Sequence, residues 1–254
     1  MHVARNVATA VLALALTFAA TAPALAQDQL EPESATYFGT VRIDMQNSRQ
    51  TWTPNQADLA GDVYNNTNPQ AAANFGFSST DLNSTFGDQV ATTGTGLLQQ
   101  NDYTVYNAAG GNLLTATYLI SFFDGTTGNP LGSYNSSVNF GTGLPAGSFA
   151  VVTSINLGVF NININTQNVI VTQKRVASTG TSTKLGIASL DPPTIGSSTN
   201  TMYIASSTVN GGTPGFYNIG NPALNANPGY RINVSTATST IKGTWGKMKS
   251  LYHS

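Results

Sequence analysis

The chain has 254 residues, a formal net charge of −1, no cysteine, and charged residues at only 8% of its length. Folded proteins usually carry about a quarter charged residues, so the solubility of this chain must rest on Asn, Thr, Ser, Gln and Gly. The near-zero charge lacks the basic footprint of a nucleic-acid-binding protein. The missing cysteines exclude thiol catalysis, Cys-ligated zinc and disulfide bonds.

The N-terminus has the organisation of a secretory signal peptide over residues 1–26. A short basic start with Arg5 precedes an apolar run over residues 7–20, and Ala24-Leu25-Ala26 forms a small-x-small cleavage pattern. The alternative is a membrane anchor, but the run is shorter than the roughly 20 residues that a spanning helix needs. We therefore expect cleavage after residue 26 and a secreted or extracellular protein, with the periplasm or the cell surface as other destinations. We expect no membrane span in the mature chain.

The first part of the mature chain changes character twice. Residues 27–36 are acidic and polar, which predicts a flexible tail. Residues 37–44 alternate between two faces, which is the pattern of a strand. Residues 46–74 are rich in Asn, Gln, Thr and Pro, so we expect a long loop or short irregular pieces there.

Strand patterns dominate the remainder of the chain. Alternating or apolar runs predict strands over residues 114–122, 134–140, 149–159, 160–164, 169–175, 185–190, 202–204 and 230–234. The exposed face switches at Val159-Phe160, which fits a turn at Gly158 or a β-bulge. The sequence therefore predicts an all-β fold, a two-sheet antiparallel β-sandwich of jelly-roll-like type. We expect a single domain over residues 37–241 and a C-terminal tail over residues 242–254.

The most individual segment is the turn Asp191-Pro192-Pro193-Thr194-Ile195-Gly196-Ser197-Ser198. The two prolines fix φ and remove two backbone donors, so a central strand cannot continue through them. Gly196 can adopt a backbone conformation that is closed to other residues. We predict that Asp191, Pro192, Pro193 and Gly196 form a structural turn. In this turn Asp191 would accept hydrogen bonds from the N–H groups near Thr194 to Gly196.

Three motifs give the chain a family resemblance. They are Phe86-Gly87-Asp88-Gln89-Val90, Phe122-Phe123-Asp124-Gly125 and the segment from Asp191 to Ser198. With them the chain resembles the exported β-sandwich proteins of environmental bacteria that often bear a PEP-CTERM sorting tail. The resemblance covers about residues 75–235 and implies the fold and export, but no activity. The C-terminus departs from the family pattern, since it has neither the Pro-Glu-Pro motif nor the apolar span.

Catalytic groups are scarce. His253 is the mature chain's only histidine, and a frayed terminus supplies neither a positioned imidazole base nor a zinc cluster. A pair of carboxylates, as in glycoside hydrolysis, is the remaining catalytic option. The candidates are Asp81, Asp88, Asp102, Asp124 and Asp191. Turn chemistry accounts for the aspartates that stand beside turns, so we assign no catalytic residue.

Two weaker patterns point to ligands. Asp124 and Asn129 flank a tight loop whose oxygens could bind calcium, although a plain hairpin connection explains the same residues. Aromatic side chains in loop-rich contexts could stack on sugar rings, or could instead plug the open ends of a sandwich. These side chains are Trp52, Tyr64, Tyr103, Tyr106, Tyr203 and Tyr217.

Three hypotheses for function follow from these patterns. The first is a secreted, non-catalytic structural or binding module of the cell surface or extracellular matrix, whose partner would be an extracellular glycan or a surface protein. The second is a carbohydrate-binding module, with calcium as the alternative to having no cofactor. The third is an Asp-dependent glycan hydrolase or lyase.

Overall fold

The computed structural model describes residues 32–53, 59–69, 74–190, 192–199, 201–218 and 227–235. Strands dominate these residues, and their helical parts are two short 3-10 turns, η1 (Leu157–Phe160) and η2 (Asn210–Gly212). The predicted signal peptide, the C-terminal tail and Asp191 lie outside the described residues. No helix in the described ranges has the length and apolar character that crossing a membrane requires.

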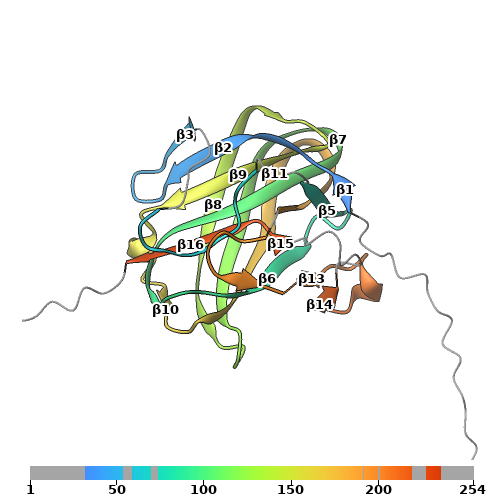
Figure 1. Ribbon diagram of the computed structural model, residues 1–254. Coiled ribbons are helices and arrows are strands. Elements are labelled where there is room, and N and C mark those ends of the chain that lie inside the picture. Colours follow the sequence, from blue (N-terminus) through green and yellow to red (C-terminus); the bar gives the residue numbers. More distant parts are fainter. Residues whose placement is uncertain are drawn as a thin grey trace, which may run out of the picture.

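One layer of the fold runs across the front of Figure 1, where β2 and β9 lie side by side. Its order is β3, β2, β9, the first half of β7, and then β16 and β4. The strands of this layer are β2 (Thr36–Asp44), β3 (Arg49–Thr53), β4 (Asp62–Asn65), β7 (Gly96–Asp124), β9 (Ser148–Ile155) and β16 (Tyr230–Ser235). The β2–β9 pair is parallel and the other pairs are antiparallel.

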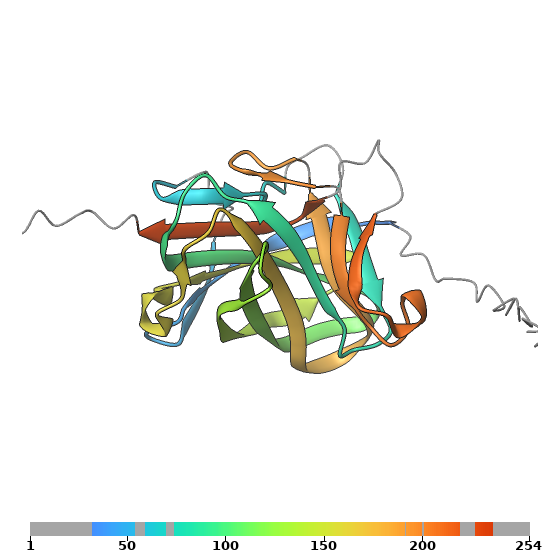
Figure 2. The same ribbon diagram turned by 90° about the horizontal axis from the view of Figure 1, so that it is seen from below.

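The second layer has the order β14, β13, β6, β11, the second half of β7, and β8. Its further strands are β6 (Thr85–Ala91), β8 (Pro130–Leu144), β11 (Asn168–Leu190), β13 (Thr201–Ala205) and β14 (Gly215–Asn218). Short strands complete the two layers: β1 (Glu33–Ser34), β5 (Phe75–Ser79), β10 (Asn163–Ile164), β12 (Ser197–Ser198) and β15 (Asn227–Pro228). Figure 2 shows the molecule from below, with the orange β13 and β14 at one side.

The long strands β7 and β11 join the two layers. They stay paired from Val169↔Asp124 to Gly186↔Tyr106, with register shifts between Arg175 and Leu185. The backbone at Gly180 has φ +114°, and a Cβ there would lie 2.2 Å from the carbonyl oxygen of Asn112. Only glycine fits this bend, which lets both strands leave one layer and enter the other.

The core lies between the layers and follows the strand alternation. In β8, Tyr134, Ser136, Val138 and Phe140 are buried, whereas the residues between them are exposed. The main cluster combines Val41 and Val152 of the first layer with Phe122 and Val171 of the second layer. Burying these large apolar side chains between two faces supplies the main stabilisation of a sandwich.

The structure confirms the all-β sandwich, with differences in detail. The β2–β9 pair is parallel, so the two layers are not purely antiparallel. The expected loop over residues 46–74 contains β3 and β4, and pairing reaches back into the expected tail, because Glu33 pairs with Gly76 and β2 begins at Thr36. The predicted strand over residues 149–159 ends at Ile155, since Asn156 begins a 3-10 turn with φ 60°.

Candidate functional site

The Pro-Pro turn lies against β4 and β6. Thr194 N–H donates to the Asn65 carbonyl at 2.8 Å, and Asn65 N–H donates to the Ile195 carbonyl at 3.0 Å. Gly196 has φ +77°, and a Cβ there would lie 2.5 Å from the Ala91 carbonyl oxygen. The turn therefore needs glycine at this position. Asp191 lies outside the described residues, so its predicted hydrogen bonds stay a prediction.

Asp88 lies beneath this turn and joins it to β6. Its carboxylate is fully buried, and the Ser198 hydroxyl donates to Asp88 Oδ2 at 2.7 Å. Burial raises the pKa of Asp88 well above its ordinary value. Asp88 lies inside β6 rather than beside a turn, so the turn role that the sequence suggested for it is wrong. The contact instead brings together the Phe-Gly-Asp motif and the last serine of the Pro-Pro turn.

Two buried tyrosines belong to the same region. Tyr64 and Tyr230 are completely buried, and the Tyr230 hydroxyl donates to the Phe86 carbonyl at 3.5 Å. Burial raises the pKa of both hydroxyls, so both stay un-ionised. Burial therefore favours a neutral Asp88 over a charged one, because no cation among the described residues compensates for the lost hydration of the carboxylate.

A second buried carboxylate cluster surrounds Arg231. The Arg231 side chain is 1% exposed, with Nε 3.5 Å from Asp62 Oδ2 and a terminal nitrogen 3.3 Å from Asp102 Oδ2. Gln100 Nε2 donates to Asp102 Oδ1 at 3.0 Å, and Leu59 N–H donates to Asp62 Oδ2 at 2.7 Å. Burial raises the pKa of Asp102 to about 6, while the Arg231 charge works in the opposite direction. The cluster joins β4, β7 and β16.

Two half-buried aspartates close loops. Asp81 accepts N–H bonds from Asn83 at 2.9 Å and Ser207 at 2.7 Å, and the hydrogen bonds from Ser207 chiefly lower its pKa. Asp124 accepts N–H bonds from Thr126 at 2.7 Å and Thr127 at 3.1 Å, which lower its pKa. Both carboxylates therefore serve the backbone turns beside them.

The predicted calcium loop is the hairpin between β7 and β8. Asp124 N–H donates to the Asn129 carbonyl at 2.9 Å, and Gly128 N–H donates to the Asp124 carbonyl at 2.7 Å. Asn129 N–H donates to the Thr127 hydroxyl at 3.3 Å. In the part of the chain that the structure describes, no three His, Cys, Asp or Glu residues gather where they could hold a metal ion. Calcium binding stays a prediction.

The aromatic residues that the sequence singled out do not share one surface. Tyr64, Tyr103 and Tyr106 are at most 1% exposed, so these three cannot belong to an exposed platform. Their loop assignment is wrong, since all three lie in strands that are covered on both faces. The three side chains are buried even though polar residues surround them in the sequence.

The other aromatic candidates lie at opposite ends of the fold. Trp52 is 45% exposed in β3 and packs edge-to-face on Phe38 at 5.6 Å. Tyr203 in β13 packs edge-to-face on Phe216 at 5.4 Å, and the neighbouring Tyr217 hydroxyl donates to the Thr213 carbonyl. The strand order places β3 at one end and β14 next to β13 at the other, as Figure 1 also shows. A single ligand cannot therefore use both ends as one platform.

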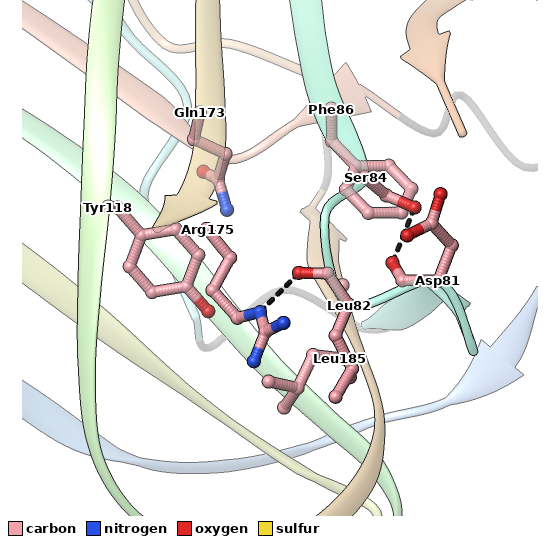
Figure 3. A pocket seen from close by; sticks show the side chains of 9 residues that line it. Asp81, Leu82, Ser84, Phe86, Tyr118, Gln173, Arg175 and Leu185 are labelled. Atoms are coloured by element: carbon pink, nitrogen blue, oxygen red, sulfur yellow. Dashed lines mark hydrogen bonds between the residues drawn. The ribbon is translucent and has the colours of Figure 1, made fainter. Parts of the chain in front are cut away.

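A small cavity lined by apolar and polar side chains lies beside Arg175, between β6, β7 and β11 (Figure 3). Arg175 Nε donates to the Leu82 carbonyl, and burial lowers the Arg175 pKa. The Tyr118 hydroxyl and Gln173 Oε1 are buried, and neither has a hydrogen-bond partner among the described residues. The cavity volume of about 10 Å³ suits one water molecule rather than a substrate.

A larger open groove lies on the outward face of the second layer. Its volume is about 270 Å³, and it is lined by Thr85, Phe123, Gly128, Ile170, Thr172 and Tyr203. Gly87 stands between Tyr203 and Thr172 in the strand register, so no side chain fills the space between them. The lining combines aromatic and aliphatic carbons with hydroxyl groups and contains no charged side chain.

Sequence reasoning found only part of this groove. The sequence predicts Tyr203 as a ligand-binding residue, but it places Ile170 in a strand and Phe123 in the Phe-Phe-Asp-Gly motif without a binding role. The alternation was the available signal: the neighbours Phe122 and Val171 are fully buried, which turns Phe123 and Ile170 outward.

No protein-family model matches the chain, and neither the curated proteins nor the solved structures contain a match to it. The resemblance to exported PEP-CTERM-associated β-sandwich proteins therefore stays a prediction from the motifs alone.

Proposed function

We propose that the mature chain is a secreted, non-catalytic structural or binding module of the cell surface or extracellular matrix. The observation that carries this proposal is that the aspartates bond to other groups of the fold. Asp81 and Asp124 serve turns, Asp88 bonds to Ser198, and Asp102 pairs with buried Arg231. Groups that are tied to the fold in this way are poorly placed to give or take protons from a substrate.

Carbohydrate binding is the second candidate, and the groove beside Tyr203 favours it. Sugar rings combine apolar faces with hydroxyl groups, and the groove offers aromatic carbons beside threonine hydroxyls without charge. Its volume lies near the lower end of small-molecule sites and suits one sugar ring of a longer glycan.

A panel of immobilised and soluble polysaccharides tests both candidates. We expect retention of the chain without release of products, with and without calcium. Tyr203→Ala should abolish the retention of the chain on polysaccharide, because it removes the aromatic side chain of the groove. Trp52→Ala, at the opposite end of the strand order, should leave this retention unchanged. Release of products that stops in Asp88→Asn or Asp102→Asn would replace this proposal with the hydrolase or lyase hypothesis.

A further inference from the structure

The strand β8 forms a long edge of the fold. It pairs with β7, and no other strand of the described residues pairs with it. Its sequence from Pro130 to Leu144 contains no charged residue and no proline after the first position. Natural edge strands are usually short or carry charges that discourage pairing with another chain. β3, with Arg49, and the four-residue β14 follow this rule, but the fifteen-residue β8 does not.

Gln50 shows that the outer side of β8 offers backbone hydrogen bonds. Asn139 N–H donates to Gln50 Oε1 at 2.8 Å, and the Asn139 carbonyl accepts a hydrogen bond from Gln50 Nε2. The Gln50 amide thus takes the place of a neighbouring strand at this one residue. Backbone groups of alternate residues point to the same side of a strand, so Ser133, Asn135 and Ser137 present theirs on the side that Gln50 occupies.

The exposed side chains of residues 133–137 have the same order, Ser-Asn-Ser, from either end of the segment. Ser133, Asn135 and Ser137 are exposed, and the pairing of β8 with β7 has no register shift between residues 132 and 139. An antiparallel pair centred on Asn135 places each Ser133 opposite the Ser137 of a second copy and Asn135 opposite itself. This symmetry is what an isologous two-fold contact requires.

We propose that the outer edge of β8, residues 133–137, binds the same edge of a second copy of this chain. The two strands would pair antiparallel across a two-fold axis at Asn135. Such a pair forms about six backbone hydrogen bonds, because each of the three outward residues exchanges two with its partner. Serine and asparagine pairs add side-chain hydrogen bonds without like-charge repulsion.

Apolar surface beside the edge favours the same partner. The Phe160 ring lies 5.6 Å from the ring of Tyr134 in β8, and Phe160 remains 39% exposed. The neighbouring Val159 is 59% exposed. A second copy could cover these side chains as well as the strand edge. The contact is small, so we expect reversible association that depends on protein concentration.

Sedimentation equilibrium of the mature chain over a wide concentration range tests this inference. We expect a monomer–dimer equilibrium. Asn135→Lys places two like charges together at the axis and should weaken dimerisation at least about tenfold. The matched control is Thr183→Lys, an exposed position in β11 that should dimerise as the wild type does. Mixing Asn135→Lys with Asn135→Asp should restore a dimer, because opposite charges then meet at the axis.

Each other outcome would overturn the proposal. A wild-type chain that stays monomeric at every concentration has no such contact. Slow hydrogen exchange at residues 133, 135 and 137 in that monomer would assign the edge to another segment of the same chain. Equal weakening by Asn135→Lys and Thr183→Lys would place the contact elsewhere, and circular dichroism would establish that both variants are folded.

Discussion

Individual residues show how this chain uses its few charged groups. Asp88 has a hydroxyl donor, two buried tyrosines nearby and no cation at hydrogen-bond distance among the described residues. Burial of this kind favours the protonated carboxyl group. At Asp102, in contrast, a buried arginine stands 3.3 Å away and opposes the effect of burial. The surroundings of each carboxylate, rather than its position in the sequence, decide its protonation.

Replacing Asp88 separates the roles of its charge and its shape. Asp88→Asn keeps an acceptor for Ser198 and resembles the neutral acid, so we expect it to cost less than about 1 kcal/mol of unfolding free energy at pH 7. Asp88→Ala removes the acceptor of the half-buried Ser198 hydroxyl and leaves a cavity at a fully buried position, so it should cost about 1–3 kcal/mol. Urea unfolding of both variants measures this difference. A loss for Asp88→Asn as large as the loss for Asp88→Ala would contradict a neutral carboxyl group at Asp88.

Gly196 allows a controlled test of steric fit at the turn. A Cβ at Gly196 would approach the Ala91 carbonyl oxygen to 2.5 Å, whereas a Cβ at Gly147 meets nothing within 4 Å. The two glycines have nearly the same φ, +77° and +74°. We therefore expect Gly147→Ala to cost about 1 kcal/mol from φ alone and Gly196→Ala to cost clearly more. Thermal unfolding compares them, and similar losses would show that the turn can move away from β6.

Among the elements, β7 explains which strands the sequence could reveal. Buried and partly exposed residues alternate in its second half, and the predicted strand over residues 114–122 lies within it. Its first half has buried residues on both faces from Asn101 to Asn107, so no alternation marks it as a strand. Several polar side chains there bond to groups of other segments instead. The Asn101 amide, for example, donates to the Arg231 carbonyl at 2.7 Å and accepts from the Tyr134 hydroxyl at 2.9 Å.

The burial of Asp102 in β7, which outweighs the effect of the Arg231 charge, predicts a specific pH dependence. The folded-state pKa of Asp102, about 6, is above its ordinary value of 3.8. The folded state therefore binds this proton more tightly than the unfolded state, and the stabilisation is complete below about pH 4 and lost as the pH rises to about 6. Urea unfolding of wild type and Asp102→Asn across this range measures the difference. Parallel stability curves would contradict the raised pKa.

At the scale of the whole molecule, the sequence predicted the fold class better than the site. Strand alternation and turn residues identify a sandwich because both depend on local periodicity. The groove beside Tyr203 is lined by residues of four strands, β6, β7, β11 and β13. Only the topology of the fold sets which strands pair with β6 on either side of Gly87. The burial of Tyr64, Tyr103 and Tyr106 likewise depends on which elements cover them.

A carboxyl-carbon NMR titration of the mature protein tests most directly the central claim that its aspartates serve the fold. We predict that Asp88 stays protonated well above its ordinary range, that Asp102 titrates near pH 6, and that Asp81 and Asp124 titrate below their ordinary value. Ordinary titration of Asp88 and Asp102, near pH 3.8, would show that solvent reaches both groups and would contradict the structural roles assigned to them.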